Sequence, residues 1–446
     1  MGEVRDYFLA HLDELKELLA INSVYDKQTA CESMPYGLGV ARALDYMRQM
    51  ALRDGFEVLE YDNQAIAIRR KGESHRQRID IASHLDVVEV GDGWSRDPFK
   101  PEVINGRLYG RGTSDMKTAA FQSYLVLKKL TEDGVPFVRE LRIVLGSDEE
   151  RTMNDMFHYV EKAGLPDFAF TPDGRFPMAI GEKGALMWHL RGKYQGTLIR
   201  RLDAGVQCNV IPPVATVQLD PHFDTSLLKE SLGRIRKYEL KDHTLTVYGK
   251  QAHCSIPWAG HSATTDLLYV LKDHDQLAAN LYEIFASPYG EGFGYHLSHG
   301  LQKSFTTNLG ILRIDENGTI YSQVDGRYPY QLNSSELTEI LKKKCIAEVS
   351  LDYDSPPTMN STDDPYIRTL LNTYRRKTWD FMKPFVSGGV SYSKVFGHCV
   401  AFGPKANDLH PTMAHQADEY IRMKDALKAF EIYYEAIRKL VSEEEL

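Results

Sequence analysis

The chain has 446 residues, 43% of them hydrophobic and 26% charged, a composition typical of a globular protein that is too long for a single core. The formal net charge of −9 and the lack of any run of lysines and arginines argue against a nucleic-acid partner, and no apolar run is long enough to span a membrane. The first twenty residues lack the features of a secretion signal, and five scattered cysteines without a C-x-x-C pair fit free thiols in a reducing compartment. We therefore expect a cytoplasmic protein.

The predicted elements of the first 180 residues alternate between helices and strands. Hydrophobic residues three or four positions apart predict an opening amphipathic helix over residues 4–19, and a second helical segment spans 117–130. Short apolar runs at 79–83, 141–145 and 168–170 predict strands that lead into polar residues. This alternation predicts an α/β fold with a mostly parallel sheet between helices, in which ligands bind beyond the carboxyl ends of the strands.

From about residue 186 the pattern changes to that of an inserted α+β domain. Strand-like segments fall at 187–191, 244–247 and 320–324, and helical segments fall at 262–271 and 335–344. A final helix carries four hydrophobic residues on one face, namely Leu427, Phe430, Tyr434 and Ile437. We predict a discontinuous catalytic domain of residues 1–185 and 381–446, with a lid or substrate-binding domain inserted at 186–380.

Histidines and carboxylates follow the predicted strands in a pattern that suits a two-metal hydrolytic centre. Imidazole and carboxylate ligands bind zinc or manganese, and a bridging carboxylate lets two such ions lie roughly 3.5–4 Å apart. The two-residue spacing of His84 and Asp86 puts both side chains on one side of an extended backbone, where the carboxylate can orient the imidazole. The candidate residues are His84, Asp86, Asp115, Glu149, Glu150, Asp173 and His415. The pattern indicates a hydrolase.

These motifs resemble the metallopeptidase family that contains carboxypeptidase G, acetylornithine deacetylase, succinyl-diaminopimelate desuccinylase and the PepV-type bacterial dipeptidases. The run TPDGRFPMAIGEKG is similar to the dipeptidase branch. The resemblance extends in order through His84–Trp94, Tyr109–Lys117, Gly146–Glu150, Thr171–Gly184 and His415–Tyr420.

The resemblance implies a role for each of these candidate residues. His84, Asp115 and Asp173 would hold one metal ion, and Glu150, His415 and the shared Asp115 would hold the other. Glu149 would be the general base that takes a proton from a water between the two ions. Asp86 would steady the imidazole of His84.

The resemblance also implies substrate contacts from the insert and from the segment after it. His253 would reach the substrate carbonyl, and Asn209 would add a second polar contact. Arg327 would bind the free carboxylate of the substrate, for which a bidentate guanidinium is suited. Gly388 and Gly389 resemble a glycine-rich loop near that carboxylate.

Taken together, the resemblance implies a metal-dependent dipeptidase that acts on short peptides with a free C-terminal carboxylate. It would bind two divalent ions, with Zn²⁺ favoured and Mn²⁺ or Co²⁺ as alternatives. The long insert resembles that of the PepV-type enzymes and favours a monomer, with a dimer as the alternative.

The sequence leaves two other functions open. An N-acyl-amino-acid deacylase would use the same centre, and a catalytically silent binding protein could have the same fold, although the complete set of ligands argues against the latter. His410 is interpreted as a loop residue because only His415 precedes the Gln-x-Asp-Glu-Tyr pattern. Cys254, beside His253, is expected to be a small buried residue.

Overall fold

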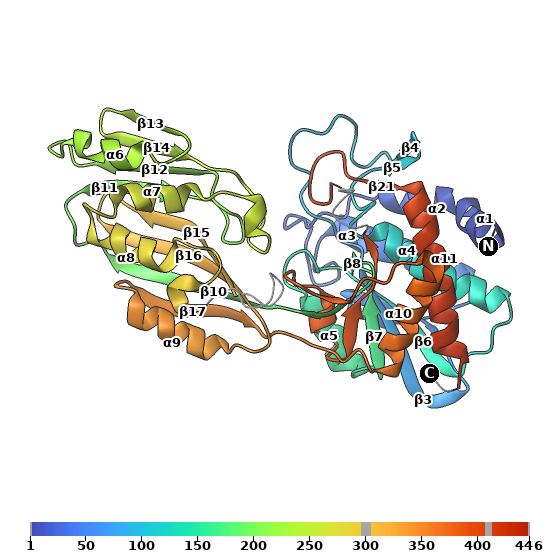
Figure 1. The fold of residues 1–446 in the computed structure, drawn as a ribbon. Helices are drawn as coiled ribbons and strands as arrows, with labels where there is room; N and C mark the ends of the chain where they lie inside the picture. The colour runs from blue at the N-terminus through green and yellow to red at the C-terminus, as the bar shows by residue number, and fades with distance from the viewer. Residues whose placement is uncertain (1, 296–304, 406–412, 445–446) are drawn as a thin grey trace. The chain divides into compact units, whose positions relative to one another are not determined.

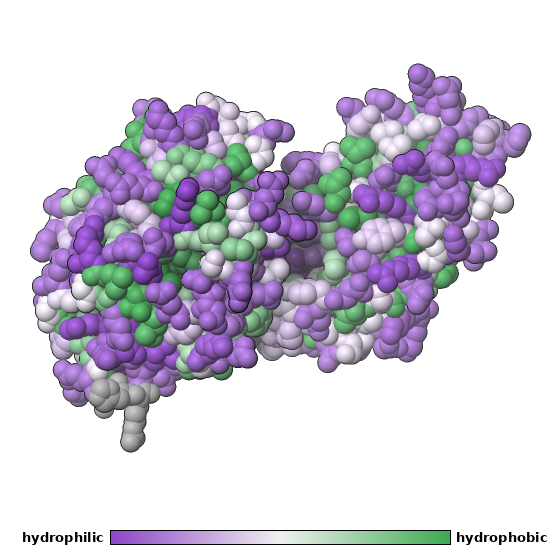
Figure 2. Space-filling model, turned by 180° about the vertical axis from the view of Figure 1, so that it is seen from behind, coloured by the Kyte–Doolittle hydropathy of each residue, from purple (hydrophilic) through white to green (hydrophobic). Residues whose placement is uncertain are grey.

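The computed structural model describes residues 2–295, 305–405 and 413–444. The chain divides into two compact units, each with its own hydrophobic core (Figure 1). The first unit comprises Met1–Gly181, Asn360–Phe385 and Ser391–Leu446, and the second comprises Glu182–Met359 and Val386–Val390. On the face seen in Figure 2, hydrophobic residues are scattered among polar ones. No helix within the described ranges is long and apolar enough to cross a membrane.

The first unit is built on an eight-stranded sheet whose central strands are parallel, as the predicted α/β fold class requires. Strand β3 pairs in parallel with β6 and β7, and β19 pairs in parallel with β7, whereas β1, β2 and β9 pair antiparallel with their neighbours. In order across the sheet, the strands are β1 (Glu57–Tyr61), β2 (Ala65–Arg70), β6 (Arg139–Gly146), β3 (Ser74–His84), β7 (Phe168–Thr171), β19 (Cys399–Ala401), β9 (Ala179–Glu182) and β18 (Phe385–Ser387).

Helices cover both faces of this sheet, because successive side chains of a strand point to opposite faces. Ile79 and Ile81 of β3 belong to the buried cluster that includes α4 and α11, whereas Asp80 between them accepts a hydrogen bond of 2.8 Å from Tyr159 of α5. The helices are α1 (Gly2–Ala10), α2 (Leu12–Ala20), α3 (Leu38–Arg53), α4 (Lys117–Glu132), α5 (Asn154–Ala163), α10 (Pro365–Thr378) and α11 (Met423–Ser442).

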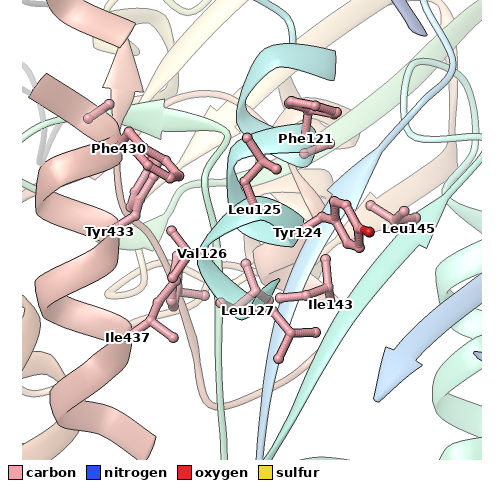
Figure 3. Close-up of a cluster of buried hydrophobic side chains, with 14 of the residues drawn as sticks. Phe121, Tyr124, Leu125, Val126, Leu127, Ile143, Leu145, Phe430, Tyr433 and Ile437 are labelled. Carbon is pink, nitrogen blue, oxygen red and sulfur yellow. The ribbon is translucent and has the colours of Figure 1, made fainter. Parts of the chain in front are cut away.

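The core of the first unit forms where α4 and α11 pack on the sheet. Figure 3 shows Tyr433 and Ile437 of α11 pointing towards α4, with Val126 of α4 beside them and Ile143 of β6 to the right of α4. All four side chains are buried. At about 25 cal/mol per Å² of apolar surface, such burial is the main contribution to stability.

The first unit also contains two small sheets, and one of them positions the segments that carry Asp115 and His415. In this sheet, β21 pairs with β5, so that Tyr420 lies opposite Tyr109. This pairing brings the chain that follows His415 beside the chain that leads to Asp115. The strands are β4 (Glu102–Ile104), β5 (Arg107–Tyr109) and β21 (Tyr420–Arg422) in one sheet, and β8 (Gly174–Arg175) and β20 (Pro404–Lys405) in the other.

The second unit is an antiparallel eight-stranded sheet with helices packed on it, the α+β architecture expected for the insert. In order across the sheet, the strands are β13 (Tyr238–Lys241), β14 (Thr244–Tyr248), β12 (Val214–Leu219), β11 (Ile199–Ala204), β15 (Thr306–Ile314), β16 (Thr319–Tyr328), β10 (Gly184–Lys193) and β17 (Glu348–Ser355). The helices are α6 (Lys229–Leu232), α7 (Ala263–Leu271), α8 (Gln276–Phe285) and α9 (Ser334–Lys344), with short 3₁₀ turns η1 (Thr225–Leu228), η2 (Pro257–Ala259) and η3 (Glu291–Phe293). A further turn, η5 (Tyr392–Lys394), belongs to the first unit.

The boundaries between the units differ from the expected residues 186 and 380. Helix α10 lies in the first unit because it packs on α11 and places Ile367, Leu370 and Tyr374 in that core. Residues 386–390 lie in the second unit, where the N–H of Lys183 donates to the carbonyl of Ser387 at 2.8 Å.

Candidate metal centre

Three neighbouring parallel strands end where the predicted ligands begin. His84 is the last residue of β3 and lies beside Gly146, the last residue of β6, and Glu149 follows three residues later. Strand β7 ends at Thr171, two residues before Asp173. Because parallel strands share the edge at which they end, these side chains meet there.

All five predicted metal ligands lie close together in the first unit. His84 Nε2 lies 3.4 Å from Asp115 Oδ1 and 4.0 Å from Asp173 Oδ2. His415 Nε2 lies 3.4 Å from Asp115 Oδ2 and 3.1 Å from Glu150 Oε1. Asp115 therefore turns one carboxylate oxygen towards each imidazole, which is the geometry of a bridging ligand.

The ligand atoms form two groups that differ in part from the expected sets. One group comprises His84, Glu149 and Asp173, and the other comprises His84, Asp115 and Glu150; within each group the atoms lie within 4.8 Å of one another. Glu149, expected only as the base, therefore lies near enough to His84 and Asp173 to be a ligand as well; its Oε2 is 3.9 Å from His84 Nε2.

The hydrogen bonding of His84 fits a bound cation. Its Nδ1 lies 3.0 Å from the main-chain carbonyl of Asp86, which can only accept, so Nδ1 carries the proton of the neutral ring. The lone pair is then on Nε2, which is buried and makes no hydrogen bond within the described residues. Burial lowers the pKa of His84, but Asp115 and Asp86 outweigh this effect and raise it well above its ordinary value, so the position at Nε2 attracts a cation and this donor set fits a divalent metal ion in place of the proton.

Crowding of the carboxylates shifts the pKa values of the cluster. Burial raises the pKa of Glu149 well above its ordinary value, and the charges of Asp173, Glu150 and Asp115 raise it further. Partial desolvation by the surrounding protein lowers the pKa of His415, but Asp115 and Glu150 outweigh this effect and raise it to about 10. The cluster therefore holds protons that divalent cations would replace.

Asp86 orders both the imidazole of His84 and the turn that carries Glu149 and Glu150. Its Oδ1 accepts the N–H of Glu149 at 3.3 Å, and its Oδ2 accepts the N–H of Glu150 at 3.1 Å. The direct bond from His84 goes to the main-chain carbonyl of Asp86, and the carboxylate lies 3.4 Å away from the ring. Asp86 thus connects the ends of β3 and β6 in the centre.

Glu419 is a buried residue whose role the sequence analysis did not identify. Its Oε1 accepts the N–H groups of Ser114 and Asp115 at 2.8 and 3.0 Å. Its Oε2 accepts the N–H of Gly112 at 3.1 Å and Nη1 of Arg111 at 2.8 Å. The available signal was its position in the Gln-x-Asp-Glu-Tyr pattern, which had served only to identify His415.

His415 combines exposure with an unusual backbone conformation. Its side chain is 52% exposed, and its φ of 62° lies in the left-handed region that residues other than glycine rarely adopt. Such a conformation costs on the order of 1 kcal/mol and persists where the surroundings enforce it. His410 lies outside the described residues.

The predicted substrate contacts from the insert, His253 to the carbonyl and Asn209 as a second polar contact, are neighbours in the second unit. The main-chain N–H of Cys254 donates to the carbonyl of Asn209 at 2.9 Å. Nδ1 of His253 accepts the N–H of Ser255 at 3.2 Å, so the proton of the neutral ring is on Nε2. This tautomer makes Nε2 a hydrogen-bond donor, as a contact to a carbonyl oxygen requires.

Arg327 is buried and forms a bidentate ion pair with Asp325 at 2.9 and 2.8 Å. The pair uses two of the five guanidinium donors. Lys183, which the sequence analysis missed, lies buried between β9 and β10; burial and the charge of Arg327 together lower its pKa to about 8. The run Gly-Glu-Lys-Gly had signalled the family but not this cation.

Gly388 and Gly389 lie in the second unit near the loop of His253. A Cβ on Gly388 would lie 3.0 Å from that of Ser255, so glycine permits this close approach. Gly389 donates its N–H to Ser387 Oγ at 3.1 Å.

An imidazole and carboxylate cluster at the carboxyl edge of an α/β sheet, with a separate α+β unit inserted in the chain, is typical of a metallohydrolase. The family model described as Peptidase family M20/M25/M40 matches residues 81–439, and the chain belongs to this family of hydrolases.

Relatives and solved structures agree with this assignment over the full length of the chain. A protein of Staphylococcus saprophyticus named "Putative dipeptidase" is 30% identical over 472 aligned residues that cover 99% of each chain, and a protein of the same description from Staphylococcus haemolyticus is 30% identical over 468. Human carnosine dipeptidase 1 has the same fold, with a TM-score of 0.60 at 14% identity and 98% of each chain covered. Dug1p from Saccharomyces cerevisiae has it with a TM-score of 0.59 at 13% identity and 99% covered.

Proposed function

We propose that the protein is a metal-dependent dipeptidase that hydrolyses short peptides with a free C-terminal carboxylate. The observation that carries this proposal is Asp115, whose two oxygens each lie 3.4 Å from a different imidazole. The names of full-length relatives support the choice of dipeptides among the substrates of the family.

The proposed metal ligands are His84, Asp115 and Asp173 for one ion, and Asp115, Glu150 and His415 for the other. Zn²⁺ suits such donors best, and Mn²⁺ or Co²⁺ are alternatives. When bound, the two ions would act as Lewis acids and make a water acidic enough to react near neutral pH.

Glu149 would take the proton of the attacking water and return it to the departing amine. Its raised pKa suits this exchange, because a carboxylate with an ordinary pKa binds a proton too weakly. Asp86 would hold the turn of Glu149 in place through the two main-chain N–H groups that it accepts.

Residues of the second unit would bind the substrate. Nε2 of His253 would donate to the carbonyl oxygen as negative charge develops on it, and Asn209 would add a polar contact. Arg327 would bind the terminal carboxylate, with Gly388 and Gly389 leaving room for it and Lys183 adding a second positive charge. Because one chain carries all these groups, we propose a monomer, and its five free cysteines support a cytoplasmic location.

The decisive experiment measures hydrolysis by metal-stripped protein reloaded separately with Zn²⁺ or Mn²⁺. The substrates are L,L-, D- and β-alanyl dipeptides, C-amidated dipeptides and matched N-acyl amino acids. We expect cleavage of free dipeptides that is lost on amidation. Preference for N-acyl substrates would instead identify a deacylase, and no turnover with either metal would identify a binding protein.

A further inference from the structure

A cavity of about 380 Å³ lies inside the second unit, next to the loop that carries His253. Its walls come from Cys254, from Pro257 and residues 260–262, from α7 and α8, and from residues 307–309 of β15. All of its lining residues belong to the second unit. The volume lies within the range of small-molecule sites, roughly 300–1,000 Å³, and is large enough for an amino acid.

Two opposite charges line this cavity near one face of α7. Asp266 and Tyr269 lie three residues apart on the helix and therefore share a face. The exposed guanidinium of Arg234 pairs with Glu230 through Nη2 at 2.5 Å and lies against the hydroxyl of Tyr269, with Nη1 at 3.4 Å, so it keeps donors that face the cavity. Asp266 Oδ2 lies 2.7 Å from Nε2 of His261. A ligand here meets a cation and a carboxylate together.

The remaining lining combines apolar side chains with a buried hydroxyl. Ile211, Phe285 and Leu309 are buried and supply an apolar surface. Thr307 is also buried, and its Oγ1 makes no hydrogen bond within the described residues. A buried hydroxyl without a partner is unfavourable by about 1–3 kcal/mol, and a polar ligand group would relieve this.

We propose that this cavity binds a free amino acid with an apolar or aromatic side chain. The α-carboxylate would pair with Arg234, the ammonium group with Asp266, and the side chain with the apolar surface. Such an amino acid is also a product of the proposed dipeptidase reaction. Regulation of the enzyme by its product therefore rests on the proposed function, whereas binding of the amino acid to the cavity does not.

Two lining residues connect the cavity to the proposed substrate contacts. The thiol of Cys254 donates to Asp325 Oδ1 at 3.0 Å, and Asp325 holds Arg327. Asn308 Nδ2 donates to the carbonyls on either side of Asn209, those of Cys208 and Val210, at 2.8 and 2.9 Å. A bound amino acid would therefore change KM for dipeptides.

Calorimetry on the full-length, metal-stripped protein tests binding without turnover. The probes are L-leucine and L-phenylalanine, with 3-phenylpropionate and phenethylamine as analogues that lack one charge. The variants are Arg234→Met and Asp266→Asn. Arg236→Met is the matched control, because this arginine is exposed and does not line the cavity.

We expect the amino acids to bind and both variants to weaken binding by about tenfold or more, with no change in Arg236→Met. Binding that is equal in all variants, equal affinity for the single-charge analogues, or no binding at all would overturn the proposal. In the metal-loaded enzyme, L-leucine should change KM more in the wild type than in Arg234→Met, where only its binding as a product at the catalytic site remains; equal changes would overturn the regulatory effect. Absence of turnover would refute the dipeptidase activity and leave the calorimetric result intact.

Discussion

Glu149 is the proposed general base, yet it also lies within reach of the proposed metal ligands His84 and Asp173. Glu149→Gln separates these two roles because the amide keeps the shape and cannot accept a proton. We expect kcat to fall by about 10²–10⁴-fold, with the metal content unchanged. The measurements are steady-state kinetics and metal analysis, with Glu161→Gln on the exposed side of α5 as control. Loss of metal together with activity would instead make Glu149 a ligand.

The buried carboxyl of Asp80 makes the free energy of unfolding depend on pH, and this effect is separate from the metal centre. Burial raises its pKa to about 6, and the nearby charge of Arg78 only partly opposes this. Since the folded state holds this proton more tightly than the unfolded state, the stabilisation is complete below about pH 4 and is lost as the pH rises through about 6. The wild type should therefore lose about 1.4 kcal/mol relative to Asp80→Asn between pH 5 and pH 8. Urea unfolding of both proteins at the two pH values measures the difference; a constant difference would contradict the raised pKa.

At the scale of elements, the candidate metal centre depends on β21 lying beside β5 and on Glu419. The carboxylate of Glu419 joins the segment before β21 to the loop of Asp115. Glu419→Gln would leave the buried guanidinium of Arg111 without its counter-charge and would offer only one acceptor oxygen to four donors. We expect a loss of about 3–5 kcal/mol in the free energy of unfolding, together with weaker metal binding.

Asp418→Asn is the matched control for this variant. Asp418 adopts a φ of 56°, which asparagine tolerates, and it contacts Ser95 rather than the loop of Asp115. The control should change stability by less than about 1 kcal/mol. Equal effects of the two variants would assign the loss to the segment as a whole and not to the buried carboxylate.

The same elements show how far the sequence could be interpreted. Alternating apolar runs predicted β3, β6 and β7, and the parallel sheet that they form is confirmed. Hydrophobic spacing did not reveal that the first helix ends at Ala10 and a second begins at Leu12, because spacing reports faces and not continuous hydrogen bonding. Nor could it assign α10 to a unit, since an amphipathic pattern does not specify which core a helix joins.

The candidate site was predictable where its residues follow strands, and less so where long-range contacts define it. Nothing local indicates that Glu419 accepts four hydrogen bonds from a loop about 300 positions earlier in the chain. The ion pair of Asp325 and Arg327 could have been predicted from the sequence, because residues two apart on a strand share a face.

At the scale of the whole molecule, two separate cores imply two unfolding transitions, and only one of them should respond to metal. All proposed ligands belong to the first unit. An ion at 100 times its Kd stabilises the unit that binds it by about 2.7 kcal/mol, and removing it should lower that transition by about 5–10 °C.

Two tryptophans allow the transitions to be followed separately. Trp94 lies in the first unit under the guanidinium of Arg111, and Trp188 is buried in the core of the second unit against Phe293. Replacing the exposed Trp258 and Trp379 by phenylalanine, and then either Trp94 or Trp188, leaves one reporter in each protein. A chelator should lower the midpoint reported by Trp94 and leave that reported by Trp188 unchanged. If both midpoints fall together, the two cores unfold as one cooperative unit, and metal binding in the first unit stabilises the second as well.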